Sequence, residues 1–114
     1  MLTLLEFETT AAHCKAKIKD KKALQEVIER YPSYEDKKEA VVYVILAILK
    51  NRPFTQDNNS IATLVLWQLC GESPVIIFPT DAVYTLPNLW KKLSEEEHSP
   101  QEAKNLIFGE DRNG

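Results

Sequence analysis

The sequence predicts a mainly α-helical protein, a compact bundle of helices with at most a short β-hairpin. Three observations predict this class. Apolar residues recur at the spacing of a helix face in several segments. Two long apolar runs, residues 40–49 and 61–70, have helix start or end signals beside them. The strand-like stretches, residues 2–7 and 75–78, are both short.

Composition narrows the class of protein. The chain has 114 residues, of which 44% are hydrophobic and 27% charged, and its formal net charge is −3. These values are typical of one soluble globular domain, which we expect over residues 1–108 with a disordered tail at residues 109–114. The mild acidity argues against a protein that coats nucleic acid. No glycine precedes Gly71, so that part of the chain has no glycine-rich phosphate loop.

The first third of the chain is basic. Residues 2–7 fit either a strand or the start of a helix, and from about Thr10 the pattern is helical. Residues 24–31 repeat apolar side chains at helical spacing, and Pro32 ends that helix. We expect a cluster of lysines in this region to form a solvated helix face. The cluster consists of Lys15, Lys17, Lys19, Lys21 and Lys22.

The next helix is predicted over residues 34–50. Ser33 followed by Asp36 resembles a capping box that would open it. Residues 40–49 are apolar on every side, which predicts a helix buried on all sides. The β-branched residues in this run also fit a strand, but its length and the cap favour a helix.

A polar loop, residues 51–60, separates this helix from a second apolar helix at residues 61–70, which Gly71 ends. Ends of buried helices need partners for their free amides and carbonyls. Loops held between rigid elements are also where functional sites are often built. The loop is therefore the first candidate for a functional site.

The C-terminal part predicts two more helices. The first lies within residues 81–97, and Pro87 either kinks it or marks its true start. The second begins at Ser99, with a proline in the first turn and Glu102 three residues after the cap. Both are amphipathic, so we expect both to pack against the buried helices.

The cysteines and the start of the chain suggest a compartment. Cys14 and Cys70 are too few and too far apart for a disulfide framework or a zinc site. We expect Cys70 to be a small core residue and Cys14 to lie on a partly exposed helix. The start of the chain has no signal-peptide pattern, and the longest apolar run is too short to span a bilayer. These features predict a cytoplasmic protein without membrane contact.

Residues 52–62 read Arg-Pro-Phe-Thr-Gln-Asp-Asn-Asn-Ser-Ile-Ala between the two apolar helices. This arrangement resembles the Fic/Doc (Fido-fold) family, whose motif is His-Pro-Phe-x-Asp/Glu-Gly-Asn-Gly/Lys-Arg. The residues that match are Pro53, Phe54, Asn58 and Ala62. The resemblance covers roughly residues 24–108 and implies a compact, Doc-like helical bundle. It also implies that Phe54 anchors the loop in the core and that Asn58 helps to fix its backbone.

The resemblance places other residue types at the family's catalytic positions. Arg52 stands for the histidine that acts as general base, and Gln56 for the metal-binding acid. Asp57 stands for the glycine, Asn59 for the Gly/Lys position and Ser60 for the phosphate-binding arginine. The resemblance therefore implies a degenerate member of the family.

Each replacement removes a chemical function. The guanidinium of an arginine keeps its proton throughout the physiological pH range, so Arg52 cannot act as a base. The neutral Gln56 is a poor Mg²⁺ ligand. Asp57 repels phosphate at a helix N-terminus, where it could itself cap the helix, and Ser60 lacks the bidentate fork of arginine. We expect no catalytic residue, no metal and no cofactor at this loop, and the same losses argue against nucleotide binding.

Two alternatives remain for the motif. A one-residue gap pairs Asp57 with the family acid and Asn59 with the asparagine, but it still lacks the histidine and the arginine. The match can also be accidental, in which case the segment is a loop before a capped helix. The matching segments on both sides favour the resemblance.

The resemblance therefore implies a catalytically inactive relative that binds a protein partner as an inhibitor, an immunity or antitoxin-like protein, or a regulator. The candidate surface is the degenerate motif loop, residues 52–60. Its candidate site residues are Arg52, Pro53, Phe54, Gln56, Asp57, Asn58, Asn59 and Ser60.

Two other functions fit parts of the sequence. A divergent nucleotidyl- or phosphotransferase that modifies a protein hydroxyl would need Asp57 or His98 to replace the lost groups, and His98 lies in an acidic turn where we expect it to be solvent-exposed. A nucleic-acid-binding module would use the lysine cluster, but no aromatic residues are interleaved with it. Trp67 and Trp90 lie on apolar helices and are expected to be core or interface anchors.

Overall fold

The computed structural model describes residues 2–70 and 86–108. This part of the chain is mainly helical, which confirms the predicted class. In chain order its helices are α1 (Leu4–His13), α2 (Lys21–Arg30), a 3₁₀ turn (Tyr31–Ser33), α3 (Lys37–Asn51), α4 (Asn58–Cys70), α6 (Leu86–Glu95) and α7 (Pro100–Phe108). The expected strand at residues 75–78 and the expected tail at residues 109–114 lie outside the described residues, as does the side chain of Cys70.

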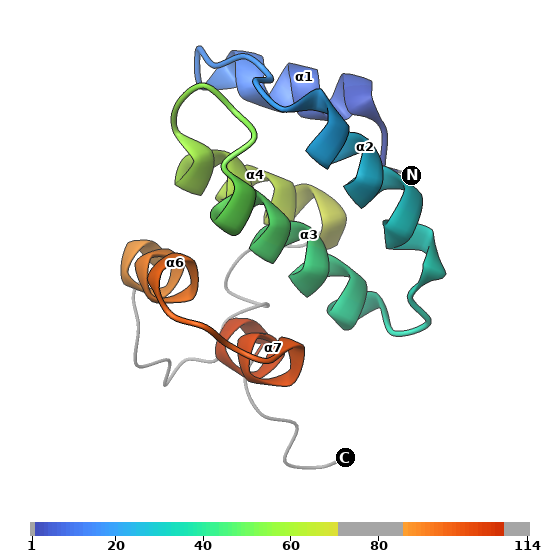
Figure 1. Cartoon of the computed structure of the whole chain (residues 1–114), viewed down its shortest axis with the longest axis vertical. Coiled ribbons are helices and arrows are strands. Elements are labelled where there is room, and N and C mark those ends of the chain that lie inside the picture. The colour runs from blue at the N-terminus through green and yellow to red at the C-terminus, as the bar shows by residue number, and fades with distance from the viewer. Residues whose placement is uncertain (1, 71–85, 109–114) are drawn as a thin grey trace.

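Helix α3 forms the centre of the bundle. It packs against α2, α4, α6 and α7, and Figure 1 shows α3 and α4 lying between the α1–α2 pair and the α6–α7 pair. Its buried side chains are Ala40, Val41, Val42, Val44, Ile45, Ile48 and Leu49. Tyr43, Leu46 and Ala47 are half-buried, so the expectation of burial on all sides holds for the other seven residues of the run 40–49 but not for these three. The radius of gyration is 13.5 Å, close to the ~13 Å of a compact chain of this length.

The helix predicted from about Thr10 through the lysine cluster is interrupted. Helix α1 ends at His13, and Lys15 adopts a positive φ of 56°, which a continuing helix excludes. Helix α2 starts only at Lys21, where the Asp20 carboxylate accepts a hydrogen bond from the backbone N–H of Ala23 (3.1 Å). Residues 14–20 therefore form a turn between α1 and α2, named here the α1–α2 turn. At the other end of α1, residues 2–7 resolve as helix rather than strand from Leu4 onward.

The capping box predicted at Ser33 is wrong. The Ser33 hydroxyl donates to the carbonyl of Arg30 (2.6 Å), inside the 3₁₀ turn. Asp36 is the N-cap of α3, and its carboxylate accepts from the backbone N–H of Lys38 (2.8 Å). Lys104 of α7 donates to the other oxygen of the same carboxylate (2.6 Å), so this cap also ties the C-terminal helix to α3. The hydrogen bond from Lys104 lowers the pKa of Asp36.

The predicted capping box of α7 is confirmed. The N–H of Glu102 donates to the Ser99 hydroxyl (3.2 Å), and the N–H of Ser99 points back to the Glu102 carboxylate (3.5 Å). These bonds with Ser99 lower the pKa of Glu102. The expectation that His98 is exposed is wrong, because its side chain is 7% exposed and its Nδ1 lies 3.7 Å from the Glu102 carboxylate. The reason is that α6 and α7 fold together at this corner, where Lys50 of α3 donates to the carbonyl of Glu96 (2.6 Å).

Among the described residues, no helix combines the length and the apolar character that crossing a membrane requires.

Candidate functional site

The motif loop begins at the C-terminus of α3. Arg52 is the C-cap and adopts the left-handed conformation, with φ 47° and ψ 60°, while its N–H donates to the Ile48 carbonyl (3.0 Å). This conformation turns the chain sharply, so the next residue, Pro53, is buried and the Arg52 side chain is exposed. The Pro53 carbonyl accepts two hydrogen bonds from the α1–α2 turn, from the N–H groups of Lys19 (2.7 Å) and Asp20 (3.0 Å).

Phe54 and Asn58 fix the middle of the loop. The Phe54 ring is 0% exposed and lies 6.2 Å from the ring of Phe7 on α1. Asn58, at 4% exposure, holds the Phe54 backbone with both ends of its side-chain amide. Its Oδ1 accepts from the Phe54 N–H (3.0 Å), and its Nδ2 donates to the Phe54 carbonyl (3.1 Å). The loop therefore closes on itself around a buried ring, with both backbone groups of Phe54 satisfied.

The next two residues attach the loop to the α1–α2 turn. The Thr55 N–H donates to the Lys17 carbonyl (2.9 Å), and the Lys17 N–H donates to the Thr55 hydroxyl (3.0 Å). The Gln56 amide donates to the carbonyls of Cys14 (3.3 Å) and Lys15 (3.1 Å). Figure 1 shows the two turns side by side. Gln56, at the acid position of the motif, thus bonds to backbone carbonyls rather than facing an open site.

Asp57 stands at the start of α4. It has a positive φ of 54°, and its carbonyl accepts the N–H of Ile61 (2.9 Å), so it occupies the position before the first helical residue. Within the described part of the chain its exposed carboxylate makes no hydrogen bond, so the expected side-chain cap is not formed. Burial raises the pKa of the Cys14 thiol, and the nearby negative charge of Asp57 raises it further. A thiol with a raised pKa is a poor nucleophile.

Asn59 and Ser60 complete the loop. Ser60 is exposed. Asn59 is half-buried, and its backbone carbonyl accepts the Thr63 hydroxyl (3.2 Å). Its side-chain oxygen is buried without a hydrogen-bond partner in the described part of the chain. Among the predicted site residues that carry a charge or a hydroxyl, those that reach solvent are Arg52, Asp57 and Ser60. The buried predicted residues are Pro53, Phe54 and Asn58.

The arrangement offers little for group transfer. His98 lies against Glu102 at the α6–α7 corner, so the structure does not bring it together with Asp57. No three His, Cys, Asp or Glu side chains in the described ranges, 2–70 and 86–108, gather closely enough to hold a metal ion. The exposed groups of the loop include a guanidinium, a carboxylate and hydroxyls, which suit hydrogen bonding and ion pairing with another surface.

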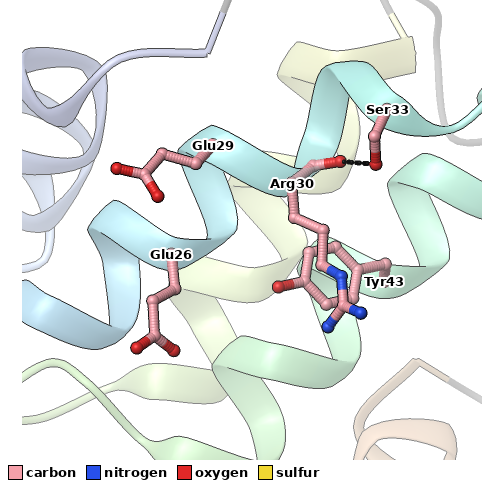
Figure 2. Close-up of a pocket in the computed structure, with 5 residues that line it drawn as sticks. All are labelled: Glu26, Glu29, Arg30, Ser33 and Tyr43. Carbon is pink, nitrogen blue, oxygen red and sulfur yellow. Dashed lines mark hydrogen bonds between the residues drawn. The ribbon is translucent and has the colours of Figure 1, made fainter.

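A second candidate is an open hollow of about 420 Å³ between α2 and α3. Figure 2 shows Arg30 lying across the ring of Tyr43, with the Glu26 and Glu29 carboxylates pointing away from the guanidinium. The guanidinium carbon is 5.8 Å from the centre of the Tyr43 ring, within the range of a cation–π contact. Ser33 completes the lining. The mixed charge and open shape of this hollow favour no particular class of ligand.

Sequence reasoning missed this hollow. Glu26, Glu29 and Arg30 follow one another at helical spacing on the polar side of α2, a pattern that is typical of a solvated face. Tyr43 was the usable signal, because a phenolic hydroxyl in an otherwise apolar run needs a polar or solvated surrounding. Its place in the run predicted burial instead.

Comparison of the chain with protein-family models, with curated proteins and with solved structures finds no match in any of the three.

Proposed function

We propose that this chain is a degenerate, Doc-like member of the Fic/Doc family that transfers no group and acts in the cytoplasm by binding a protein partner. Its role is that of an inhibitor, an immunity or antitoxin-like protein, or a regulator, and the motif loop is part of its binding surface. One observation carries the proposal: two polar side chains at motif positions bond to the protein's own backbone instead of lining an open site. Gln56 bonds to two carbonyls of the α1–α2 turn, and Asn58 bonds to the backbone of Phe54.

The chemistry of the exposed loop residues supports an inactive site. Transfer to a hydroxyl requires a base whose pKa lies near the working pH. A guanidinium such as that of Arg52 cannot serve as this base. The Asp57 carboxylate stands at the N-terminus of α4, where a transferred phosphate would otherwise meet free amides. The negative charge of Asp57 disfavours phosphate there.

The bonding of the loop supports a binding role. The loop is held against the α1–α2 turn by hydrogen bonds: the Pro53 carbonyl accepts, and the Thr55 N–H and the Gln56 side-chain amide donate. A surface that is already ordered loses little conformational entropy when a partner binds. Arg52 and Asp57 present opposite charges on this ordered loop, an arrangement that favours a partner with complementary charges.

The position of Asn58 also favours the ungapped alignment with the family motif. Asn58 is buried and holds the Phe54 backbone, the role that the motif asparagine implies. Asn59, which the gapped alignment places at that position, leaves its side-chain oxygen without a partner in the described part of the chain.

Activity is tested with labelled ATP, Mg²⁺ or Mn²⁺, and a lysate of the host cell. We expect no transfer of labelled phosphate or AMP to any protein, and no shift in melting temperature with several nucleotides. Arg52→Ala serves as the control. Transfer by the wild-type chain that is lost in Arg52→Ala contradicts the proposal and favours a divergent nucleotidyl- or phosphotransferase.

Binding is tested by photo-cross-linking. A photoreactive residue replaces Ser60 on the motif loop or, as a control, the exposed Gln101 on α7. We expect a discrete cross-linked protein from position 60 and none from position 101. Unlabelled wild-type chain should compete, whereas the charge swap Arg52→Glu/Asp57→Lys, which keeps the net charge, should not. Equal competition by the swapped variant would rule out the motif loop as the binding surface.

A further inference from the structure

The α1–α2 turn exposes three lysines, Lys15, Lys17 and Lys19, named here the lysine row. From residue 15 to residue 19 the side chains alternate: Ala16 is 6% exposed and Ile18 is half-buried, whereas Lys15, Lys17 and Lys19 are exposed. Ile18 pairs with Phe54 of the motif loop in an antiparallel bridge. Around this bridge, alternate residues of the extended backbone project to the same side about 7 Å apart. Lys17 and Lys19 therefore share one face, and Lys15, with its positive φ, lies in the turn that precedes them.

The motif loop holds this row in place. Lys17 exchanges hydrogen bonds with Thr55 through both its N–H and its carbonyl. The Lys19 N–H bonds to Pro53, and the Lys15 carbonyl accepts from Gln56. Each of the three lysines is thus fixed by its backbone, while its side chain stays free to meet a partner.

The two segments together are strongly basic. Residues 15–22 and 52–57 carry six cationic side chains and two carboxylates, a net charge of +4. Because the whole chain carries −3, the remaining residues carry −7. Within the described residues none of the six cations forms an ion pair. We name this surface the basic face; its cations are Lys15, Lys17, Lys19, Lys21, Lys22 and Arg52.

We propose that the basic face docks an extended, acidic segment of the partner protein. The inference rests on the proposed function, because it assigns a chemical character to the partner of the motif loop. An extended segment with carboxylates at alternate positions has the same ~7 Å spacing as Lys17 and Lys19. The negative charge of such a segment complements the six cations of the basic face, which form no ion pairs within the described residues. Binding the segment therefore relieves the repulsion between these cations.

The surroundings of the face favour a protein over a nucleic acid. Non-specific binding of single strands needs exposed aromatic rings on which bases stack, and the two rings beside the face, Phe7 and Phe54, are buried. Asp20 and Asp57 lie within the two segments and repel closely spaced phosphates. The net charge of −7 on the rest of the chain opposes a long polyanion, whereas a short acidic segment needs to meet only the face.

The test is a titration of the full chain against a fluorescein-labelled peptide of alternating Glu and Ser, followed by anisotropy at low and at physiological salt. Parallel titrations use single-stranded DNA, duplex DNA and vesicles containing phosphatidylserine. Lys17→Glu/Lys19→Glu reverses the row. Lys37→Glu/Lys91→Glu reverses two exposed lysines on α3 and α6, and the two variants change the net charge equally.

We expect the row variant to bind the acidic peptide about tenfold more weakly than the wild-type chain, and the control variant to stay within about twofold. Thermal melting establishes that both variants are folded. Absent peptide binding, or an equal loss in both variants, overturns the proposal. Tighter binding of DNA or of vesicles than of peptide also overturns it, in favour of that ligand. The proposed function is unaffected by either result, because nucleotide transfer and cross-linking from position 60 test it separately.

Discussion

Removing the Asn58 side chain tests whether the motif loop is a structural element. Asn58→Ala deletes the acceptor of the Phe54 N–H and the donor to the Phe54 carbonyl, both in buried hydrogen bonds of 3.0 and 3.1 Å. A buried polar group that loses its partner costs about 1–3 kcal/mol, so two such groups cost about 2–6 kcal/mol of unfolding free energy. Because small domains are stable by about 5–15 kcal/mol, we expect a large fall in stability.

The assay is urea unfolding followed by tryptophan fluorescence. Asn59→Ala is the matched control, since it removes a neighbouring asparagine whose side-chain oxygen is buried without a partner among the described residues. We expect Asn59→Ala to change the unfolding free energy by less than about 0.5 kcal/mol or to raise it, because it deletes an unsatisfied group.

Asn58→Asp separates the two hydrogen bonds. The new carboxylate still accepts from the Phe54 N–H but places a second oxygen against the Phe54 carbonyl. Burial raises the pKa of such a group in the folded state. Its protonated form can donate to the carbonyl, so the difference in stability from the wild-type chain should shrink as the pH falls through the raised folded-state pKa and level off below about 4, the pKa of an unfolded aspartate. If Asn58→Ala costs no more than Asn59→Ala, the account of the loop is wrong.

Three further predictions concern other parts of the molecule. Trp90→Phe replaces a buried indole whose N–H donates to a threonine hydroxyl of α4 at 2.7 Å. We expect this change to cost about 2–3 kcal/mol in urea unfolding. The same change at the other, exposed tryptophan should cost less than about 1 kcal/mol. The hydrogen bond from Lys104 lowers the pKa of Asp36, so this ion pair stabilises the fold above the carboxyl's unfolded pKa of about 4 and loses its effect as the pH falls through the lowered folded-state pKa. The urea midpoint should therefore fall as the pH drops below about 4, and Lys104→Met should flatten this dependence. An unchanged profile would refute the prediction. With the other cysteine replaced by serine, Cys14 should react with iodoacetamide more slowly than a free thiol at pH 8, and Asp57→Asn should accelerate the reaction about twofold; an unaltered rate would show that the Asp57 charge does not reach the thiol.

Local patterns in the sequence predicted the helices well where local signals determine them. The start of α7 follows from Ser99 and Glu102, whose capping hydrogen bonds join residues only three positions apart in the chain. The cap of α3 could not be predicted in the same way, because Ser33 and Asp36 are both good caps. Asp36 gains a bond from Lys104 of a distant helix, which the sequence pattern does not reveal.

The α1–α2 turn and the motif loop show the same difference between local and distant causes. The lysine-rich stretch has helical propensity, yet its backbone bonds to Pro53 and Thr55 favour a turn. The burial of Phe54 and the contacts of Asn58 agree with the roles that the motif resemblance implied. The role of Gln56 could not be anticipated, because its partner carbonyls become available only when the chain leaves the helix after His13.

The pairing of the α1–α2 turn with the motif loop also determines when each is formed during folding. Lys17 and Thr55 are 38 residues apart, so their hydrogen bonds close a long loop of chain. Helices form locally and rapidly, whereas contacts between distant residues wait until the intervening segments have met. The turn therefore gains its structure only after α3 has formed and the chain has returned past its C-terminus. On the nascent chain, the lysine row remains unstructured until the motif loop has been synthesised, so the proposed binding surface and the helical core are completed together.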